Sequence, residues 1–277
     1  MSAHKIPLAG VIGAPVAHSR SPILHGHWLK TYGIDGYYIP MEVSSADLED
    51  VLRAMPRMGF VGVNVTIPHK ELVMNIADLV TDRATLIGAA NTLIFRKDGK
   101  IHADNTDGYG FIENLKAGAP DWNPAAGPAT VIGAGGAARA VIVALLDAGV
   151  PEILLTNRTR ARAEKLQMDF GNRVKVFDWV QAGNIIEDAH LVVNTSSLGM
   201  TGQAEMRVPL DGLRSDMIVT DLVYTPLKTK LLETAEAAGA TVVDGLGMLL
   251  HQGVPGFERW FGKRPDVDEA TRKAVLG

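Results

Sequence analysis

The chain has 277 residues, of which 47% are hydrophobic and 21% charged, the balance of a globular protein with one large or two medium domains. The formal net charge of −4 is small and mixed along the chain, which argues against nucleic acid or an anionic membrane as the main partner, and no apolar stretch approaches the ~20 residues of a membrane span or resembles a signal peptide. There is no cysteine, which excludes disulfides, thiol nucleophiles and cysteine-containing zinc sites and is typical of a cytoplasmic protein.

Strands and helices alternate along the first part of the chain, and this pattern is typical of a largely parallel sheet covered on both faces. A serine N-cap followed by an amphipathic repeat predicts one of the helices. Asp98-Gly99 predicts a hairpin turn between two short strands. The expected strands are 6–13, 36–43, 59–66, 90–95 and 100–105, and the expected helices are 21–33, 44–55 and 68–79.

A segment rich in Pro, Gly and Ala, residues 116–129, is typical of a domain junction. After it we expect a strand, a glycine turn and a helix over 130–149, a helix over 160–170, and strands over 152–157, 190–196, 217–224 and 241–245. The last apolar helical stretch, 246–262, is too long merely to close a sheet, so we expect it to return to the first domain. The predicted division is a discontinuous substrate-binding domain of residues 1–107 and 243–277, and a Rossmann-type domain of residues 108–242.

The glycine turn "TVIGAGGAAR" has the spacing G-x-G-x-x-A directly between an apolar strand and a helix. Gly133 allows the tight turn, Gly135 lets the backbone approach a pyrophosphate, and Ala138 is small enough for close packing of helix and strand. The free N–H groups at the start of the helix then bind the anion. This context favours dinucleotide binding over a purely structural turn, and the predicted cofactor contacts are Gly133, Ala134, Gly135, Gly136 and Ala137.

The next strand indicates which dinucleotide is bound. NAD-binding domains place an Asp or Glu at its end, where it accepts hydrogen bonds from the ribose 2′-hydroxyl. This chain has Asn157 there, followed by Arg158 and Arg162. A guanidinium pairs with a 2′-phosphate, and no carboxylate is present to repel it, so the pattern favours NADP.

The segment "GVNVTIPHK" reads as a strand that carries Asn64 and Thr66 on one face, and Pro68 suits the first position of a helix. Lys70 would then lie in the first helical turn, where the macrodipole disfavours a cation. Hydride transfer to or from an alcohol carbon also needs a proton donor or acceptor, and the chain has no cysteine–histidine zinc site. Lys70 is therefore the candidate acid/base, although a solvated surface lysine would fit the same pattern.

The candidate partner of this lysine lies in "HADNTDGYGF", where Asp104 and Asp107 flank a polar pair at the end of the predicted hairpin. A carboxylate there could hold the ammonium and share a proton with a substrate hydroxyl. The alternatives are a turn residue or a helix N-cap, since Asp before Gly is favoured in both.

Seven segments in order, "HSRSP", "NVTIPHK", "GAANT", "DNTDGYG", "GAGGAAR", "NRTRARAE" and "DGLGMLLHQ", resemble the shikimate dehydrogenase family over nearly the whole chain. The resemblance implies two α/β domains that flank a cleft, with reversible reduction of 3-dehydroshikimate to shikimate by NADPH in aromatic amino acid biosynthesis. It also implies that Lys70 and Asp107 form the catalytic pair. No metal is expected, and a homodimer is compatible with the sequence.

The same resemblance implies the remaining contacts. Ser19 and Ser21 match the serines that bind the substrate carboxylate, although Ser21 could instead cap the helix that begins at Pro22. Polar side chains around the ring hydroxyls correspond to Asn64, Thr66, Asn91 and Gln252, and a tyrosine near the carboxylate corresponds to Tyr224. The matching cofactor contacts beyond the glycine turn are Asn157, Arg158, Thr159, Arg162, Thr195, Ser196, Gly245 and Met248.

Two other functions stay open at this point. One is a quinate/shikimate dehydrogenase with relaxed use of substrate or cofactor, against which the Asn157-Arg158 pair and the intact serines argue. The other is a non-catalytic ligand sensor on the same fold, against which the retention of both Lys70 and Asp107 argues.

Overall fold

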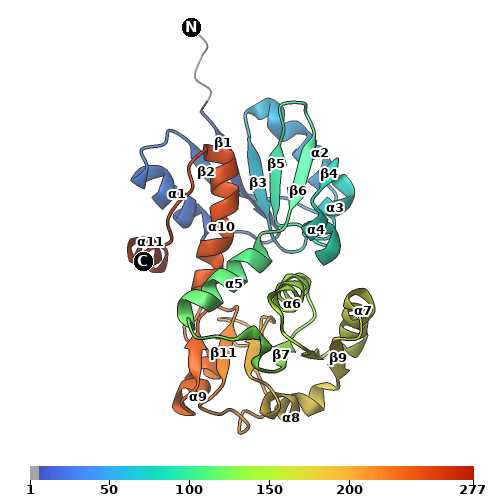
Figure 1. Ribbon diagram of the computed structural model, residues 1–277. Coiled ribbons are helices and arrows are strands. Elements are labelled where there is room, and N and C mark those ends of the chain that lie inside the picture. Colours follow the sequence, from blue (N-terminus) through green and yellow to red (C-terminus); the bar gives the residue numbers. More distant parts are fainter. Residues whose placement is uncertain (1–5) are drawn as a thin grey trace. The chain divides into compact units, whose positions relative to one another are not determined.

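The computed structural model describes residues 6–277, which form two compact units (Figure 1). One unit contains the chain up to Asp107 together with Leu249–Gly277, and the other is Gly108–Met248. Each unit has its own six-stranded sheet. No helix in the described part of the chain is both long and apolar enough to cross a membrane.

The first unit is built on a mixed sheet with the strand order β2-β1-β3-β5-β6-β4. Only β5 runs against its neighbours, β3 and β6, and the remaining pairs are parallel. The predicted mostly parallel mixed sheet is therefore confirmed, as is the turn at Asp98-Gly99 between β5 and β6, where Gly99 has φ +83°. The strands are β1 (Leu8–Gly13), β2 (Tyr37–Glu42), β3 (Gly62–Val65), β4 (Leu79–Val80), β5 (Thr92–Phe95) and β6 (Ile101–Asp104).

Helices of this unit pack apolar side chains onto the sheet. Leu48 and Leu52 of α2 (Leu48–Ala54) bury themselves against Val63 and Leu93. Aromatic side chains join α1 (Ser21–Thr31) to α10 (Leu246–Phe261), since Trp28 and Phe257 lie edge to face with ring centroids 5.3 Å apart. The other elements are the 3₁₀ turn η1 (Met55–Met58) and the helices α3 (Val73–Ile76), α4 (Asp82–Ile87) and α11 (Glu269–Leu276).

The helix predicted over 68–79 is wrong in its extent. Only Val73–Ile76 is helical, and residues 67–72 form turns. The proline that we expected at the first helical position instead lies in the first of these turns. As a consequence, Lys70 precedes α3 by three residues instead of lying in the first turn of a helix.

The second unit is an all-parallel sheet with the strand order β12-β11-β10-β7-β8-β9. Chain order reverses between β7 and β10, and such a switch point is where doubly wound sheets bind ligands. The predicted Rossmann-type fold is confirmed, although β9 was not predicted from the sequence. The strands are β7 (Ala129–Ile132), β8 (Ile153–Thr156), β9 (Val174–Phe177), β10 (Leu191–Asn194), β11 (Ile218–Asp221) and β12 (Thr241–Val243).

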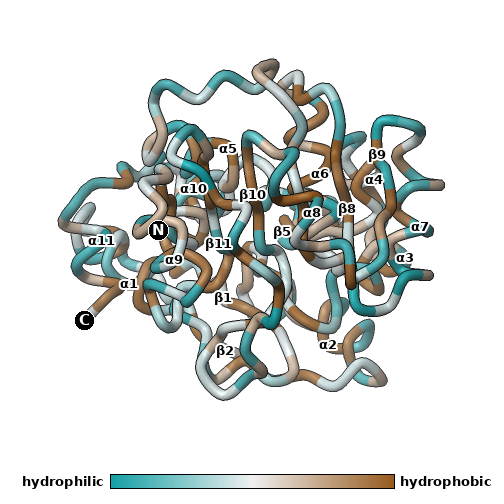
Figure 2. The backbone as a smooth tube through the Cα atoms, turned by 90° about the horizontal axis from the view of Figure 1, so that it is seen from below, coloured by the Kyte–Doolittle hydropathy of each residue, from teal (hydrophilic) through white to brown (hydrophobic). Residues whose placement is uncertain are grey.

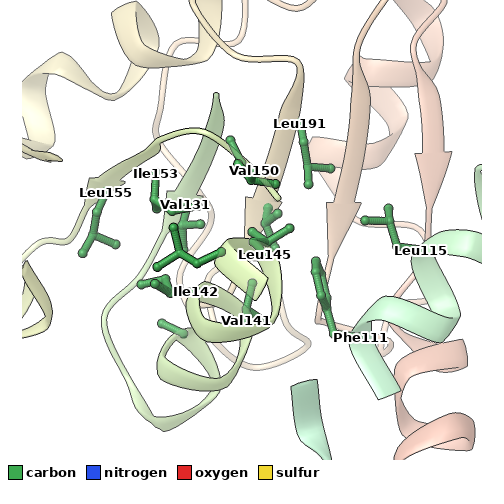
Figure 3. Packing of buried hydrophobic residues seen from close by; sticks show 14 of the residues in the cluster. Phe111, Leu115, Val131, Val141, Ile142, Leu145, Val150, Ile153, Leu155 and Leu191 are labelled. Carbon is green, nitrogen blue, oxygen red and sulfur yellow. The ribbon is translucent and has the colours of Figure 1, made fainter. Parts of the chain in front are cut away.

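Helix α6 supplies the core on one face of this sheet. Figure 3 shows Val141, Ile142 and Leu145 of α6 packed against Val131 and Ile153 of the strands. In Figure 2 the colour along the helices alternates between apolar and polar, as expected where only one side of a helix is buried. The helices are α5 (Asp107–Gly118), α6 (Gly136–Ala148), α7 (Arg160–Phe170), α8 (Ala182–Glu187) and α9 (Lys230–Ala237), with the 3₁₀ turns η2 (Pro124–Ala126) and η3 (Trp179–Gln181).

The second boundary between the units lies after Met248, six residues beyond the predicted one after residue 242. The first turn of α10 packs into the second unit, where Met248 joins the apolar cluster around Phe111 and Leu115. Gly247 lies so close to Asn114 that a Cβ would stand 1.8 Å from its Oδ1 atom. That the two units bind substrate and cofactor, respectively, stays a prediction.

Candidate active site

The centre of the first unit's polar site is an ion pair between Lys70 and Asp107. The Nζ atom of Lys70 lies 2.5 Å from Oδ2 of Asp107, and the two side chains are 19% and 7% exposed. Exposed ion pairs contribute little to stability, but a largely buried ammonium and carboxylate must remain together, because each is costly to bury alone. The structure therefore brings together the two residues predicted to form the catalytic pair.

Neighbouring residues hold the backbone of both members of the pair. The carbonyl of Lys70 accepts a hydrogen bond from Ala90 N at 2.8 Å. Asp107 is the first residue of α5, where the helix dipole favours a negative charge, and its N–H donates to Oδ1 of Asn105 at 3.0 Å. The start of α5 and the side chain of Asn105 thus fix the position of Asp107.

A buried amide network supports the carboxylate of Asp107. Nδ2 of Asn91 donates to Oδ1 of Asp107 at 2.8 Å and lies 3.1 Å from Oε1 of Gln252. Thr106 donates from its backbone N–H to Oδ1 of Asn91 and from its hydroxyl to the carbonyl of Gln252. Asn91 and Gln252, both predicted from the resemblance, therefore lie in one network with the ion pair.

Three members of this network were missed from the sequence: Thr92, Asn105 and Thr106. All three side chains are buried. All three lie within the motifs "GAANT" and "DNTD", so the signal was their place beside predicted site residues. A buried polar residue needs hydrogen-bond partners, and each of these three has at least one predicted site residue among its partners: Asn91 for Thr92 and Thr106, and Asp107 for Asn105.

Asn64 and Thr66 lie at the end of β3. Asn64 is buried, and its Nδ2 donates to the carbonyl of Asn91 and to Oγ1 of Thr92, each at 3.1 Å. Thr66 follows the last residue of the strand and is half-buried. Its backbone N–H donates a hydrogen bond to the carbonyl of Ile12. Asn64 therefore belongs to the network around Asp107, whereas no hydrogen bond within residues 6–277 joins the side chain of Thr66 to that network.

The two predicted carboxylate-binding serines lie at the start of α1. Oγ of Ser19 accepts from the backbone N–H of Ser21 at 3.3 Å. Ser21 is the first helical residue and is not the N-cap, which is Arg20, so the alternative capping role of Ser21 is wrong. The guanidinium of Arg20 donates to the carbonyls of Val275 and Leu276 at the end of α11, and this ties down the chain between the serines.

The glycine turn of the second unit has the shape that a pyrophosphate needs. Gly133 has φ +113°, and a Cβ there would stand 2.7 Å from Oγ1 of Thr195. Gly135 precedes the first residue of α6, and a Cβ there would point into open space. Ala138 is fully buried, as expected for close helix–strand packing. The residues present fit a dinucleotide phosphate at the start of α6.

Of the arginines that follow β8, two are available for a 2′-phosphate. Arg160 is paired with Glu164 at 2.8 Å and with Asp178 at 2.6 Å. Within residues 6–277, Arg158 and Arg162 are exposed and have no carboxylate partner. Asn157 donates from Nδ2 to the carbonyl of Thr159, which keeps this turn compact.

Asp221 organises the loop that follows β10. Its carboxylate accepts from Nδ2 of Asn194 at 2.8 Å and from the hydroxyl of Thr229 at 2.7 Å, while Oδ1 of Asn194 accepts from Ser196. Burial raises the pKa of the Asp221 carboxyl to about 6, against the effect of these hydrogen bonds. Thr195 and Ser196 are therefore fixed beside Gly133, whereas Asp221 itself was not predicted as a site residue.

The last three predicted residues follow β11 and β12. Gly245 is required by packing, since a Cβ there would lie 2.5 Å from the carbonyl oxygen of Leu222. Met248 is 8% exposed and belongs to the core of the second unit. Tyr224 is half-buried in the same unit. The roles of these residues toward substrate or cofactor stay predictions.

The parallel sheet with its glycine turn, together with the buried Lys70–Asp107 pair, defines an α/β oxidoreductase of the dinucleotide-dependent class. Three family models match: the shikimate dehydrogenase substrate binding domain over residues 11–93, shikimate/quinate 5-dehydrogenase over 123–221, and the shikimate 5′-dehydrogenase C-terminal domain over 245–276. A protein of Roseobacter denitrificans named shikimate dehydrogenase (NADP(+)) is 71% identical over the full length of both chains. The chain belongs to the shikimate dehydrogenase family, as the resemblance predicted.

Solved structures with the same fold come from more distant relatives. Shikimate 5-dehydrogenase from Thermus thermophilus, in complex with NADP(H) and shikimate, is 37% identical with a TM-score of 0.87, over 98% of each chain. Quinate dehydrogenase from Corynebacterium glutamicum, in complex with NAD, is 31% identical with a TM-score of 0.91, over 98% of this chain and 99% of the other. The fold is therefore shared by relatives named for two different substrates.

Proposed function

We propose that this protein catalyses the reversible reduction of 3-dehydroshikimate to shikimate with NADPH, and that its two units are a substrate domain and a cofactor domain. The observation that carries the proposal is the buried contact between Lys70 Nζ and Asp107 Oδ2, at 2.5 Å. The name of the Roseobacter relative, 71% identical over its full length, supports the choice of reaction and of NADP. A sensor would have no use for such a pair, so the contact also argues against a non-catalytic function.

The chain's own residues handle the proton in this proposal. Bound nicotinamide supplies hydride in one direction and accepts it in the other. Lys70 and Asp107 share a proton with the oxygen of the reacting ring carbon, and the pair acts as a unit that donates it during reduction and accepts it during oxidation. Asn91 holds the Asp107 carboxylate in place through its Nδ2 atom.

Neutral polar side chains would bind the rest of a hydroxylated ring. Asn64, Thr66, Asn91 and Gln252 are the proposed partners of the ring hydroxyls, and a site built to pair such hydroxyls discriminates against analogues that lack them. Ser19, Ser21 and Tyr224 are the proposed partners of the carboxylate. The first two lie at the start of α1, where Oγ of Ser19 accepts from the backbone N–H of Ser21.

Replacing Ser19 by alanine is expected to raise KM for shikimate roughly tenfold or more, because a hydrogen bond to a charged group is worth about 1.5–3 kcal/mol. Oγ of Ser19 also accepts a hydrogen bond from Ser21 N, so the substitution removes this contact between the two serines as well. Steady-state kinetics with shikimate as the varied substrate measure this change, while KM for NADP⁺ serves as the internal control. An unchanged KM for shikimate would leave the carboxylate assignment without support.

Arg158→Ala is expected to weaken NADPH binding about tenfold or more and to leave NADH binding nearly unchanged, because only NADPH carries the 2′-phosphate. The matched control is Arg160→Ala, since Arg160 lies two residues away and is already paired with Glu164 and Asp178. Titration of both variants with NADPH and NADH measures the effect. Equal losses for the two cofactors would refute the assignment.

The competing function is a quinate/shikimate dehydrogenase with relaxed substrate or cofactor use, which the similarity to the Corynebacterium quinate dehydrogenase favours. Arg158 and Arg162, which have no carboxylate partner in the described part of the chain, favour NADP and argue against this alternative. The absorbance of the reduced nicotinamide, followed with shikimate or quinate and with NADP⁺ or NAD⁺, separates the two. We expect turnover mainly with shikimate and NADP⁺; comparable rates with quinate or NAD⁺ would favour the alternative. Cytoplasmic location and a homodimer stay predictions.

A further inference from the structure

The carboxyl ends of four strands lie in one row in the second unit. The last residues of these strands are register partners of one another, in the order Thr156 (β8), Ile132 (β7), Asn194 (β10) and Asp221 (β11). The proposed function puts the 2′-phosphate of NADP at the residues after β8 and the pyrophosphate at the glycine turn after β7. A dinucleotide that continues in this direction reaches the ends of β10 and β11 with its nicotinamide half.

Asp221 is fully buried at the end of this row. Its carboxylate accepts three hydrogen bonds from neutral donors: the backbone N–H of Val223 at 2.9 Å, Nδ2 of Asn194 at 2.8 Å and the hydroxyl of Thr229 at 2.7 Å. The pKa of this carboxyl is about 6, so the group is ionised at neutral pH and can only accept. The atom of Asn194 that faces it must therefore be the nitrogen.

The amide of Asn194 carries this constraint to the loop that follows β10. Its Nδ2 atom also lies 3.2 Å from the carbonyl oxygen of Leu198, another group that can only accept. Its Oδ1 atom therefore faces Ser196, which donates to it from the backbone N–H at 3.0 Å and from the hydroxyl at 2.7 Å. The oxygen of that hydroxyl accepts from Leu198 N at 3.2 Å. Asp221 thus determines, through Asn194, where the hydroxyl proton of Ser196 points.

The hydroxyl of Thr195 has also donated its proton within the protein, to the carbonyl of Ile132 at 2.9 Å. A Cβ on Gly133 would stand 2.7 Å from Oγ1 of Thr195 and 3.0 Å from Ser196 N, so the loop lies directly against the glycine turn. Since both hydroxyl protons are used, each hydroxyl offers a ligand only an oxygen lone pair. A pyrophosphate has no donor at neutral pH, so these two hydroxyls suit a different part of the cofactor.

We infer that Asp221 is a positioning residue for the loop of Thr195 and Ser196, whose hydroxyls accept hydrogen bonds from the nicotinamide half of the cofactor. The donors of that half are the carboxamide N–H groups and the ribose hydroxyls. The inference rests on the proposed function, which sets the direction of the dinucleotide. Asp221 acts only through Asn194, and because the loop is already ordered, less ordering is needed when the cofactor binds.

Asp221→Ala is expected to raise the Kd of NADPH and that of NADH by the same factor, about fivefold or more, because the two share one nicotinamide half. Adenosine 2′,5′-bisphosphate lacks that half and should bind as it does to wild type. Calorimetric titration with each of the three ligands measures these constants without turnover. Reduced cofactors are used because their nicotinamide ring is uncharged, so loss of the carboxylate charge should not itself change binding.

Asp221→Asn is the conservative variant. Its amide oxygen can still accept from Asn194 and Val223, and the hydroxyl of Thr229 can turn to accept from its amide nitrogen. Its affinity for NADPH should therefore return to within about twofold of that of wild type. A loss as large as that of Asp221→Ala would mean that the charge matters and not the orientation of Asn194, and would overturn the inference.

Thr229→Val is the matched control. It removes a donor to the same carboxylate and leaves the contact between Asp221 and Asn194 in place. The Kd of each ligand should stay within about twofold of wild type while thermal stability falls. If Asp221→Ala does not fold, Ser196→Ala breaks the other end of the same series of hydrogen bonds, and we expect the same pattern of losses.

Three results of these titrations would overturn the inference. The first is an unchanged Kd for both NADPH and NADH, and the second is a loss with NADPH alone, which would place the loop at the adenosine half. The third is an equal loss for adenosine 2′,5′-bisphosphate, which would indicate general damage to the unit. Wild-type protein that binds NADPH but does not reduce NADP⁺ with shikimate would instead contradict the proposed function alone.

Discussion

Lys70→Ala is expected to lower kcat for shikimate oxidation by a factor on the order of 10²–10⁴, the usual contribution of a positioned acid or base, with little change in KM. Lys70 is 19% exposed, and its one carboxylate partner within the described residues is Asp107, at 2.5 Å. Its removal takes away the ammonium that shares the proton with the substrate oxygen. It leaves the serines, Asn64 and Gln252 in place, so binding of the ring should survive.

Two further variants test whether a fall in kcat comes from the loss of proton transfer rather than from the loss of charge or of folding. Lys70→Arg retains a positive charge beside Asp107, but a guanidinium does not release its proton near neutral pH, so kcat should fall here as well. Lys97→Ala, in the exposed hairpin between β5 and β6, should leave kcat unchanged. Pre-steady-state and steady-state rates, with a thermal melt of each variant, provide the measurement. A Lys70→Ala protein with the kcat of wild type would remove the lysine from the mechanism.

Helices and strands were predicted correctly where the local sequence signals for them were strong. The helix predicted over 160–170 is found as Arg160–Phe170, and the strand, glycine turn and helix around Gly133 are found in that order. The four residues Val174–Phe177 of β9 were missed because a short edge strand with half-exposed residues has a weak alternation. The helix predicted from Pro68 was wrong because the residues after the proline form turns before α3 begins.

The candidate site could also be predicted only in part, but the reason differs from the one that limited prediction of the fold. Motifs single out residues one segment at a time. The family resemblance relates separate segments to one another, and so it could suggest that Lys70 and Asp107, 37 positions apart, are partners. The contact from Tyr38 to Asn64 joins β2 to β3 and follows no motif. Asp221 likewise depends on the alignment of β10 with β11, where it lies opposite Asn194. Such contacts are set by strand order and register, which a single sequence does not reveal.

His25 is expected to make the first unit lose stability in mild acid. The side chain is fully buried, neither ring nitrogen has a hydrogen-bond partner within the described residues, and burial lowers the pKa of the imidazole from 6.5 to about 3. The unfolded chain therefore binds a proton between these two pH values and the folded chain does not. Stability is fully present above about pH 6.5 and falls as the pH drops toward about 3, by roughly 5 kcal/mol at most at about 1.4 kcal/mol per pKa unit.

His25→Phe should remove this pH dependence, because phenylalanine can still stack on Tyr38 and never binds a proton. Between pH 7 and pH 5 the wild-type free energy of unfolding should fall by about 2 kcal/mol more than that of the variant, as linkage requires for a histidine kept neutral in the fold. Urea titrations at the two pH values measure the difference, and the slope with pH is compared because the substitution also changes packing. His27→Phe, two residues along the same helix and partly exposed, is the matched control and should retain the wild-type slope. If wild type and His25→Phe lose the same free energy, the imidazole gains its proton inside the fold, and the aromatic cluster around it must open to water at that pH.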